Sequence, residues 1–193
     1  MSQHASSQQR RTADTSASEC ARYGPGEGVG ELRPGDLVLI RGATPLGLAI
    51  RWFERLRYRK PQERHLAHWS HAALVLSPSG LLVEVTGRGV VLSRIEQYCE
   101  DEYHYIRLDL SDEQRRNVTR YAYSCCGQKY GTRSFLYLVL FVLLGGRFSA
   151  PDRGEHGCVA LIARALQKAG MEFDRAPADM MPGDLAKKFD VRP

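Results

Sequence analysis

The sequence predicts an α+β fold in which a small antiparallel sheet packs against helices. Several short apolar segments are bounded by glycine, proline or serine, which is typical of strands joined as hairpins. Other segments repeat apolar residues every three or four positions, which indicates helices. The chain has 193 residues, of which 43% are hydrophobic, so it is long enough to bury a proper core. We expect one domain with a tail.

The tail lies at the start of the chain. Residues 1–30 are rich in serine, alanine, glutamine, threonine and glycine and hold almost no large apolar side chains. Ordering such a segment would cost conformational entropy with little buried surface to offset it. We therefore expect a disordered tail or linker over residues 1–30 and a folded domain over residues 31–193. The domain carries the net charge of +5, which does not by itself imply nucleic acid.

Strands are expected in the first half of the domain. Pro34-Gly35-Asp36 is a turn signal, and the apolar residues 37–40 after it predict a short buried strand. Residues 46–60 repeat apolar side chains at helical spacing and predict a helix that Pro61 ends. Further strands are expected at 70–76 and 81–85, which form a hairpin around the turn 77–80, and at 90–92 and 103–108.

Helices are expected in the second half. A capping box at Ser111–Gln114 predicts a helix over 112–126. Residues 135–144 are an apolar run with about half the length that a bilayer-spanning helix needs, so they predict a buried helix. Residues 158–166 predict a last helix. Residues 182–185 then repeat the PGDL motif that opens the domain, and we interpret the repeat as a second common turn.

One of the cysteines is a candidate nucleophile. Cys158 lies at the expected start of a helix, after a loop that contains glycine. There the first backbone N–H groups are unpaired and the helix dipole is positive, so the thiolate is favoured over the thiol. The alternative is an ordinary buried cysteine at a helix start. We interpret the whole set as reduced thiols, because their number is odd and no metal-ligand spacing is present: Cys20, Cys99, Cys125, Cys126 and Cys158.

A thiolate nucleophile needs a base, and His71 is the best placed of the six histidines. It stands at the start of an expected strand, which holds its side chain rigidly, whereas His156 is too close to Cys158 in the loop to be well oriented. With a four-residue hairpin turn, Ala73 pairs with Glu84, and Glu84 shares a face with His71, one diagonal step away. Glu84 would then orient the imidazole. With a two-residue turn the two residues would be directly opposite, so either register can put the carboxylate near the imidazole, whereas a five-residue turn would place them on opposite faces.

The same histidine also belongs to a spaced set. His65, His68 and His71 follow one another at intervals of three, which suggests a metal site. They span a loop that enters a strand, however, and no acidic or cysteine ligand accompanies them at a familiar spacing. We therefore expect no metal.

The order of these motifs resembles a known enzyme group. A PGDL strand, a strand that begins Ser70-His71, a strand carrying Glu84, a G-x-x-Y motif at 127–130 and a late C-x-x-L-I helix at Cys158 follow one another. This order is similar to the circularly permuted branch of the NlpC-type papain-like cysteine hydrolases, in which the histidine strands precede the cysteine helix. The resemblance implies a permuted papain-like fold, with the nucleophile helix late in the chain.

The resemblance also implies roles for single residues. Cys158 would be the nucleophile, His71 the general base and acid, and Glu84 the residue that orients His71. Tyr130 would line the cleft and contact the substrate. The expected function is that of a cysteine peptidase or amidase that cleaves an amide bond, in peptidoglycan stem peptides, through a thioester intermediate and without a cofactor.

Two other functions stay open. The permuted branch also resembles the lecithin–retinol acyltransferase group, so a lipid acyl hydrolase or acyltransferase of the same fold is one alternative. The apolar run at 135–144 and a basic segment at 51–64 would fit a lipid substrate. The other alternative is a structural or binding module of a phage or secretion particle.

The basic segment bears on partners. Residues 51–64 carry an excess of arginine and lysine over acidic residues, which we interpret as a solvated helix face or, alternatively, a surface for an anionic polymer or anionic lipid heads. No nucleic-acid partner is expected, because no recognition motif accompanies the charge. The first residues lack the apolar region of a signal peptide. We expect synthesis in the cytoplasm and delivery to a cell wall by lysis or by a dedicated export or phage system.

Overall fold

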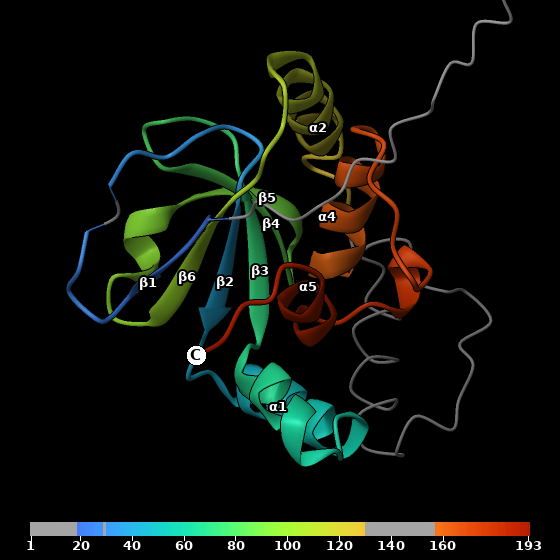
Figure 1. The fold of residues 1–193 in the computed structure, drawn as a ribbon. Helices are drawn as coiled ribbons and strands as arrows, with labels where there is room; N and C mark the ends of the chain where they lie inside the picture. The colour runs from blue at the N-terminus through green and yellow to red at the C-terminus, as the bar shows by residue number, and fades with distance from the viewer. Residues whose placement is uncertain (1–18, 29, 130–156) are drawn as a thin grey trace, which may run out of the picture.

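The computed structural model describes residues 19–28, 30–129 and 157–193 (Figure 1). In this part of the chain the centre is a six-stranded sheet in which every neighbouring pair is antiparallel. The strand order across the sheet is β1-β6-β2-β3-β4-β5. The strands are β1 (Glu19–Tyr23), β2 (Leu37–Arg41), β3 (His71–Val75), β4 (Leu81–Thr86), β5 (Gly89–Arg94) and β6 (Glu102–Arg107).

Helices surround this sheet. In Figure 1, α2 and α4 lie beside one face of the sheet, and α1 lies at the end of the sheet where β3 begins. The α+β prediction, with the cysteine helix packed against the sheet, is therefore confirmed. The α-helices are α1 (Pro45–Arg57), α2 (Asp112–Ser124), α4 (Cys158–Gln167) and α5 (Pro182–Lys188), and the short 3-10 helices are η1 (Pro61–His68), η2 (Ile95–Tyr98) and η3 (Pro177–Asp179).

The core forms on both faces of the sheet, because successive residues of a strand point to opposite faces. On one face, strand residues such as Leu39 and Leu74 pack with apolar residues of α2, α4 and α5. On the other face, Val38 and Val75 pack with Ile95 of η2. Residues 37–40, the four apolar residues of β2, therefore pack alternately into the two core layers. This explains why apolar and polar residues do not alternate in this strand.

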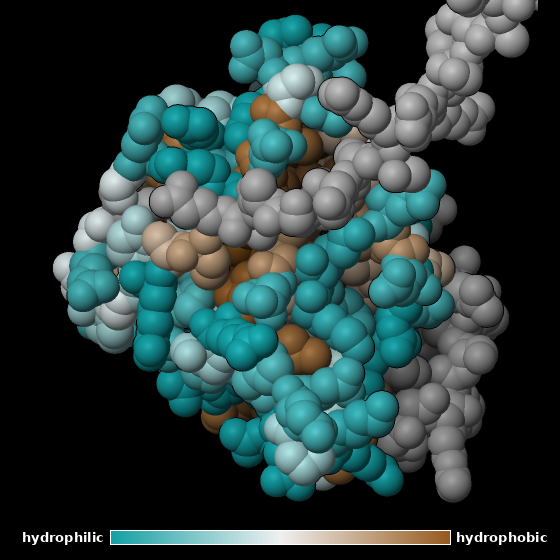
Figure 2. All heavy atoms as spheres, in the orientation of Figure 1, coloured by the Kyte–Doolittle hydropathy of each residue, from teal (hydrophilic) through white to brown (hydrophobic). Residues whose placement is uncertain are grey.

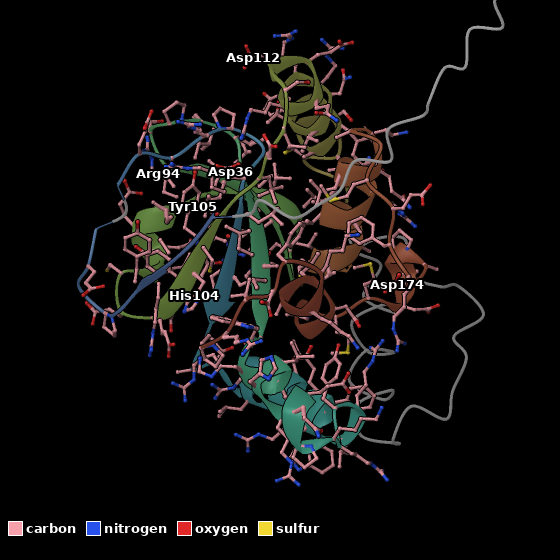
Figure 3. The ribbon with its side chains drawn as sticks, viewed as in Figure 1. Asp36, Arg94, His104, Tyr105, Asp112 and Asp174 are labelled. Carbon is pink, nitrogen blue, oxygen red and sulfur yellow. The ribbon has the colours of Figure 1, made fainter. Side chains whose placement is uncertain are left out.

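The two copies of the PGD motif adopt different structures. In the first, Asp36 is fully buried and lies close to Tyr105 (Figure 3). It accepts hydrogen bonds from the hydroxyl of Tyr105, from the guanidinium of Arg115 at 2.7 Å and from the backbone N–H of Leu108, which directly follows β6. Asp36 thus connects β2 with the end of β6 and with α2. The second copy, predicted as a turn, begins α5 instead. Its proline occupies the first helical turn, where no intrahelical partner for a backbone N–H is needed, and Asp184 accepts a hydrogen bond from Tyr58 at 2.8 Å.

The expected tail is shorter than predicted. Residues 19–23 form β1, which pairs with β6 at one edge of the sheet, so the prediction of a disordered segment through residue 30 is wrong for this part. Tyr23 stacks on Tyr103 with ring centroids 5.4 Å apart. Composition did not reveal the strand, because an edge strand gains most of its order from backbone pairing with its neighbour.

Three features predicted from the sequence lie outside the described residues: Tyr130, His156 and the apolar run at 135–144. Within the described residues, the helices are all too short or too polar to cross a bilayer.

Candidate active site

His71 and Glu84 meet on one face of the β3–β4 hairpin. The turn has four residues and Ala73 pairs with Glu84, as one of the predicted registers requires. Glu84 is therefore diagonal to His71 on the same face, and its Oε2 lies 2.5 Å from Nε2 of the imidazole. This use of Nε2 leaves Nδ1 as the ring nitrogen for another partner.

Glu84 is held as a carboxylate by several donors. Its side chain is only 1% exposed. Besides His71, it accepts hydrogen bonds from Nε2 of Gln97 at 2.6 Å and from the hydroxyl of Tyr98, both on η2. Burial alone would raise the pKa of Glu84, but the hydrogen bonds and the charge of His71 lower it to about 2. Gln97 and Tyr98 were not predicted, because no sequence pattern connects η2 with the hairpin.

Cys158 is the first residue of α4. Gly157 is the N-cap and offers no side-chain hydrogen bond to the N–H groups of the first turn. The apolar face of α4 packs on β3, β4 and α2, which fixes the position of its N-terminus. Cys158 is partly exposed, and its sulfur makes a hydrogen bond with the imidazole of His71.

The sulfur lies where β3 and β4 stop pairing. The β3–β4 register ends at Ala73 and Glu84, whereas β4 and β5 stay paired as far as Thr86 and Gly89. The N–H of Ala72 is just past the end of the ladder, and it donates to the sulfur of Cys158 instead. The end of a strand pair thus supplies a donor that a continuous ladder would have used.

The electrostatics of the pair favour an ion pair. Burial alone would raise the pKa of the Cys158 thiol, but the hydrogen bond and charge of His71 lower it below 9.0, and the N–H groups of Ala72 and Val159 add to this. Burial alone would lower the pKa of His71, but its hydrogen bonds with Cys158 and Glu84 and their charges raise it to about 10. Both shifts act in the same sense and favour a thiolate beside an imidazolium over two neutral groups.

A buried carboxyl group lies near Cys158. Glu54 of α1 is fully buried, and its Oε1 accepts a hydrogen bond from the N–H of Gly183 at 2.7 Å, while Oε2 has no partner among the described residues. Burial raises its pKa well above the ordinary value, and the nearby charges of Asp184 and Cys158 raise it further. These shifts favour the protonated form of Glu54. From the sequence, the segment 51–64 that contains Glu54 was interpreted as a solvated helix face.

The histidines predicted as an alternative metal site do not converge. Nε2 of His68 is 3.1 Å from Glu102, and Nε2 of His71 is committed to Glu84. Among the residues that the structure describes, no group of three histidine, cysteine or acidic side chains is arranged to hold a metal.

A second thiol–imidazole contact lies elsewhere on the sheet. Sγ of Cys20 on β1 is 3.4 Å from Nδ1 of His104 on β6. Figure 3 labels His104 on its strand, away from α4. Partial desolvation raises the pKa of Cys20 to about 11, and burial lowers the pKa of His104 to about 4, so both groups are neutral at pH 7.

Comparison with known proteins adds no relative: no protein-family model matches the sequence, and no curated protein matches it. The site is therefore defined by its own geometry, a Cys158–His71–Glu84 series that joins α4, β3 and β4.

Proposed function

We propose that this protein is a cysteine hydrolase that cleaves an amide bond through a thioester intermediate. The observation that carries the proposal is the hydrogen-bonded series Cys158–His71–Glu84, in which the pKa of the thiol is lowered and that of the imidazole is raised. A structural cysteine has no need of such a series, whereas a nucleophile depends on it.

The arrangement supports each step of the reaction. The Cys158 thiolate attacks the carbonyl carbon of the substrate, and the electron pair of the C=O bond moves to oxygen. N–H groups in the first turn of α4 stabilise this oxyanion. When the C–N bond breaks, the His71 imidazolium gives its proton to the departing amine, which leaves a thioester on Cys158. Neutral His71 then removes a proton from water, which attacks the thioester and releases the carboxylic acid and the thiolate.

An amide fits this site better than a substrate with a good leaving group, because an amine is expelled only after it gains a proton. The imidazolium of His71, whose pKa is raised to about 10, carries that proton before the reaction begins. Among amides we propose peptidoglycan stem peptides. This choice rests on the resemblance to the permuted NlpC-type enzymes.

A lipid acyl hydrolase or acyltransferase is the second candidate, and one observation favours it. Leu48, Trp52 and Leu56 of α1 are exposed at 51%, 56% and 38%. Such large apolar side chains suit a protein that works at a lipid surface. The chemistry at Cys158 would be the same, with an alcohol or water as the acceptor of the acyl group.

The test is a screen of muropeptides and acyl lipids with the wild-type protein, Cys158→Ala and Cys126→Ala. We expect hydrolysis of one class by the wild type and by Cys126→Ala, and a loss of roughly 10⁴-fold or more in Cys158→Ala. A mass increase on Cys158 during turnover would identify the acyl group of the thioester. Unchanged activity in Cys158→Ala would exclude the mechanism, and a fully inactive wild type with an unreactive Cys158 would favour a structural or binding module.

A further inference from the structure

The outer face of α1 carries a row of exposed apolar side chains. Leu48, Trp52 and Leu56 are spaced by four residues, so they lie along one side of the helix, and their exposed fractions are 51%, 56% and 38%. Phe53 and Glu54 are buried on the inner side. We call the three exposed residues the α1 stripe. A soluble helix normally covers such residues, so the stripe points to a partner.

Cations adjoin the stripe. Arg51 and Arg55 are four residues apart, so they lie together on one side of α1, next to the stripe. Burial and the positive charges of Arg41 and Arg55 lower the pKa of Arg51. Within the described residues, five cations of this segment make no ion pair: Arg51, Arg55, Arg59, Lys60 and Arg64.

The acidic residues of the segment do not offset this charge. Glu54 is fully buried on the inner side of the helix, away from the surface, and burial raises its pKa well above the ordinary value, which favours the uncharged form. Glu63 is already paired with Lys187 at 2.8 Å. Figure 2 shows mainly hydrophilic side chains with small hydrophobic spots at the lower end of the molecule, where α1 and η1 lie. The surface around the stripe is therefore cationic.

An apolar row flanked by arginines matches one kind of partner. Tryptophan and leucine side chains insert at the boundary between lipid head groups and acyl chains, while arginine side chains reach the phosphates above them. A nucleic acid would satisfy the arginines but would leave the stripe in water. An acidic protein could satisfy both, but three side chains in one row on a helix are a small area compared with the roughly 800 Å² per partner of a stable protein–protein interface.

We propose that α1 docks on an anionic lipid bilayer, with the α1 stripe inserted between head groups and Arg51 and Arg55 on lipid phosphates. The buried side of α1 holds Glu54, which is close enough to Cys158 to feel its charge. The helix, about 10 Å in diameter, would then lie between the bilayer and the Cys158 site. Docking goes beyond the proposed function and does not depend on it, because no step involves the thiol.

The test is flotation of the full chain with vesicles of phosphatidylcholine, with or without phosphatidylglycerol. We expect wild type and Cys158→Ala to float equally well with the anionic vesicles and poorly with the neutral ones. Leu48→Ser/Trp52→Ser/Leu56→Ser and, separately, Arg51→Gln/Arg55→Gln should each lower the apparent affinity by roughly tenfold or more. The matched control is Leu92→Ser/Arg94→Gln, which changes an exposed apolar and an exposed basic residue on β5 and should bind like the wild type.

Fluorescence gives a second measurement that does not depend on a folding-sensitive triple variant. Trp52 is exposed and the other tryptophan, Trp69, is fully buried. Anionic vesicles should shift the emission to shorter wavelength and protect it from iodide, and Trp52→Phe should still float without showing the shift. The proposal is overturned if wild type does not float with anionic vesicles, if neutral vesicles bind equally well, or if the β5 control loses as much affinity as the α1 variants. It is also overturned if the stripe is already covered in solution, by a second copy or by residues 135–144, in which case the emission of Trp52, taken as the difference between wild type and Trp52→Phe, would be blue before vesicles are added.

Discussion

The described part of the chain contains two thiol–imidazole contacts whose pKa values are shifted in opposite senses. At Cys158 and His71 the pKa of the thiol is lowered and that of the ring is raised to about 10, which favours a thiolate–imidazolium pair. Cys20 and His104, 3.4 Å apart, stay neutral, because desolvation raises the pKa of the thiol to about 11 and lowers that of the ring to about 4. Contact between a thiol and an imidazole is therefore not enough to favour the charged pair.

The difference lies in what surrounds each pair. Nε2 of His71 makes a hydrogen bond with Glu84, a buried carboxylate that stabilises the imidazolium. Nε2 of His104 is also buried, but it has no hydrogen-bond partner among the described residues. The sulfur of Cys158 also receives backbone N–H groups at a helix start and at the end of a strand ladder. Each of these supports the charged form of one partner, and the Cys20 contact lacks them.

The largest expected effect comes from removing the carboxylate. Glu84→Gln keeps the size of the side chain but not its charge, so the imidazolium keeps Cys158 but loses the second of its two partners, and hydrolysis should fall by roughly 10²–10⁴-fold. Since the coupled Cys158–His71 pair then loses its proton at a lower pH, the upper limb of the pH profile should move to lower pH. The measurement is the hydrolysis rate against pH.

The control for this experiment is His104→Gln, which changes the buried imidazole of the other pair and should leave the pH profile unchanged. If Glu84→Gln keeps the upper limb of the wild type while the protein stays folded, the carboxylate does not set the charge of His71.

A smaller effect is expected in alkylation. At pH 7, iodoacetamide should modify Cys158 at least about 100-fold faster than Cys20, although Cys20 is the more exposed residue, because the thiolate is the reactive form. His71→Ala should shift the pH dependence of Cys158 alkylation upward, since the thiol loses its positive partner. Peptide mapping of the labelled protein measures both rates. Equal rates for the two cysteines would show that their environments do not differ as described.

The smallest effect concerns stability. The pKa of Glu54 is raised in the folded state, so the folded state holds this proton more tightly than the unfolded chain does, and the wild type should lose stability, by at most about 1.4 kcal/mol per pH unit, as the pH rises above the ordinary carboxyl pKa. Glu54→Gln lacks this proton. Its melting temperature should therefore gain on that of the wild type between pH 5 and pH 8, by a few degrees.

Glu63→Gln is the matched control for thermal melting, because Glu63 is partly exposed and its pKa is lowered by the hydrogen bond with Lys187. Its difference from the wild type should stay constant between pH 5 and pH 8. A constant difference for Glu54→Gln as well would show that Glu54 is ionised in the folded protein.

The sequence predicted those parts of the site that depend on local pattern. The β3–β4 turn fixes the parity of the hairpin, so the alignment of His71 with Glu84 followed from counting residues. The start of α4 at Cys158 followed from periodicity and a preceding glycine. The donors Gln97 and Tyr98 and the neutral Glu54 were missed, because they meet the site through tertiary packing that no local pattern encodes.

The division of the site between the early β3–β4 hairpin and the late helix α4 has a consequence for synthesis. His71 and Glu84 belong to one hairpin, whose contacts are local, whereas Cys158 follows much later in the chain. Translation delivers the amino-terminal part first, so the hairpin that holds His71 and Glu84 is synthesised well before Cys158. The surroundings that lower the pKa of the Cys158 thiol therefore exist only after α4 has docked on the sheet, and until then the thiol of the growing chain stays less reactive.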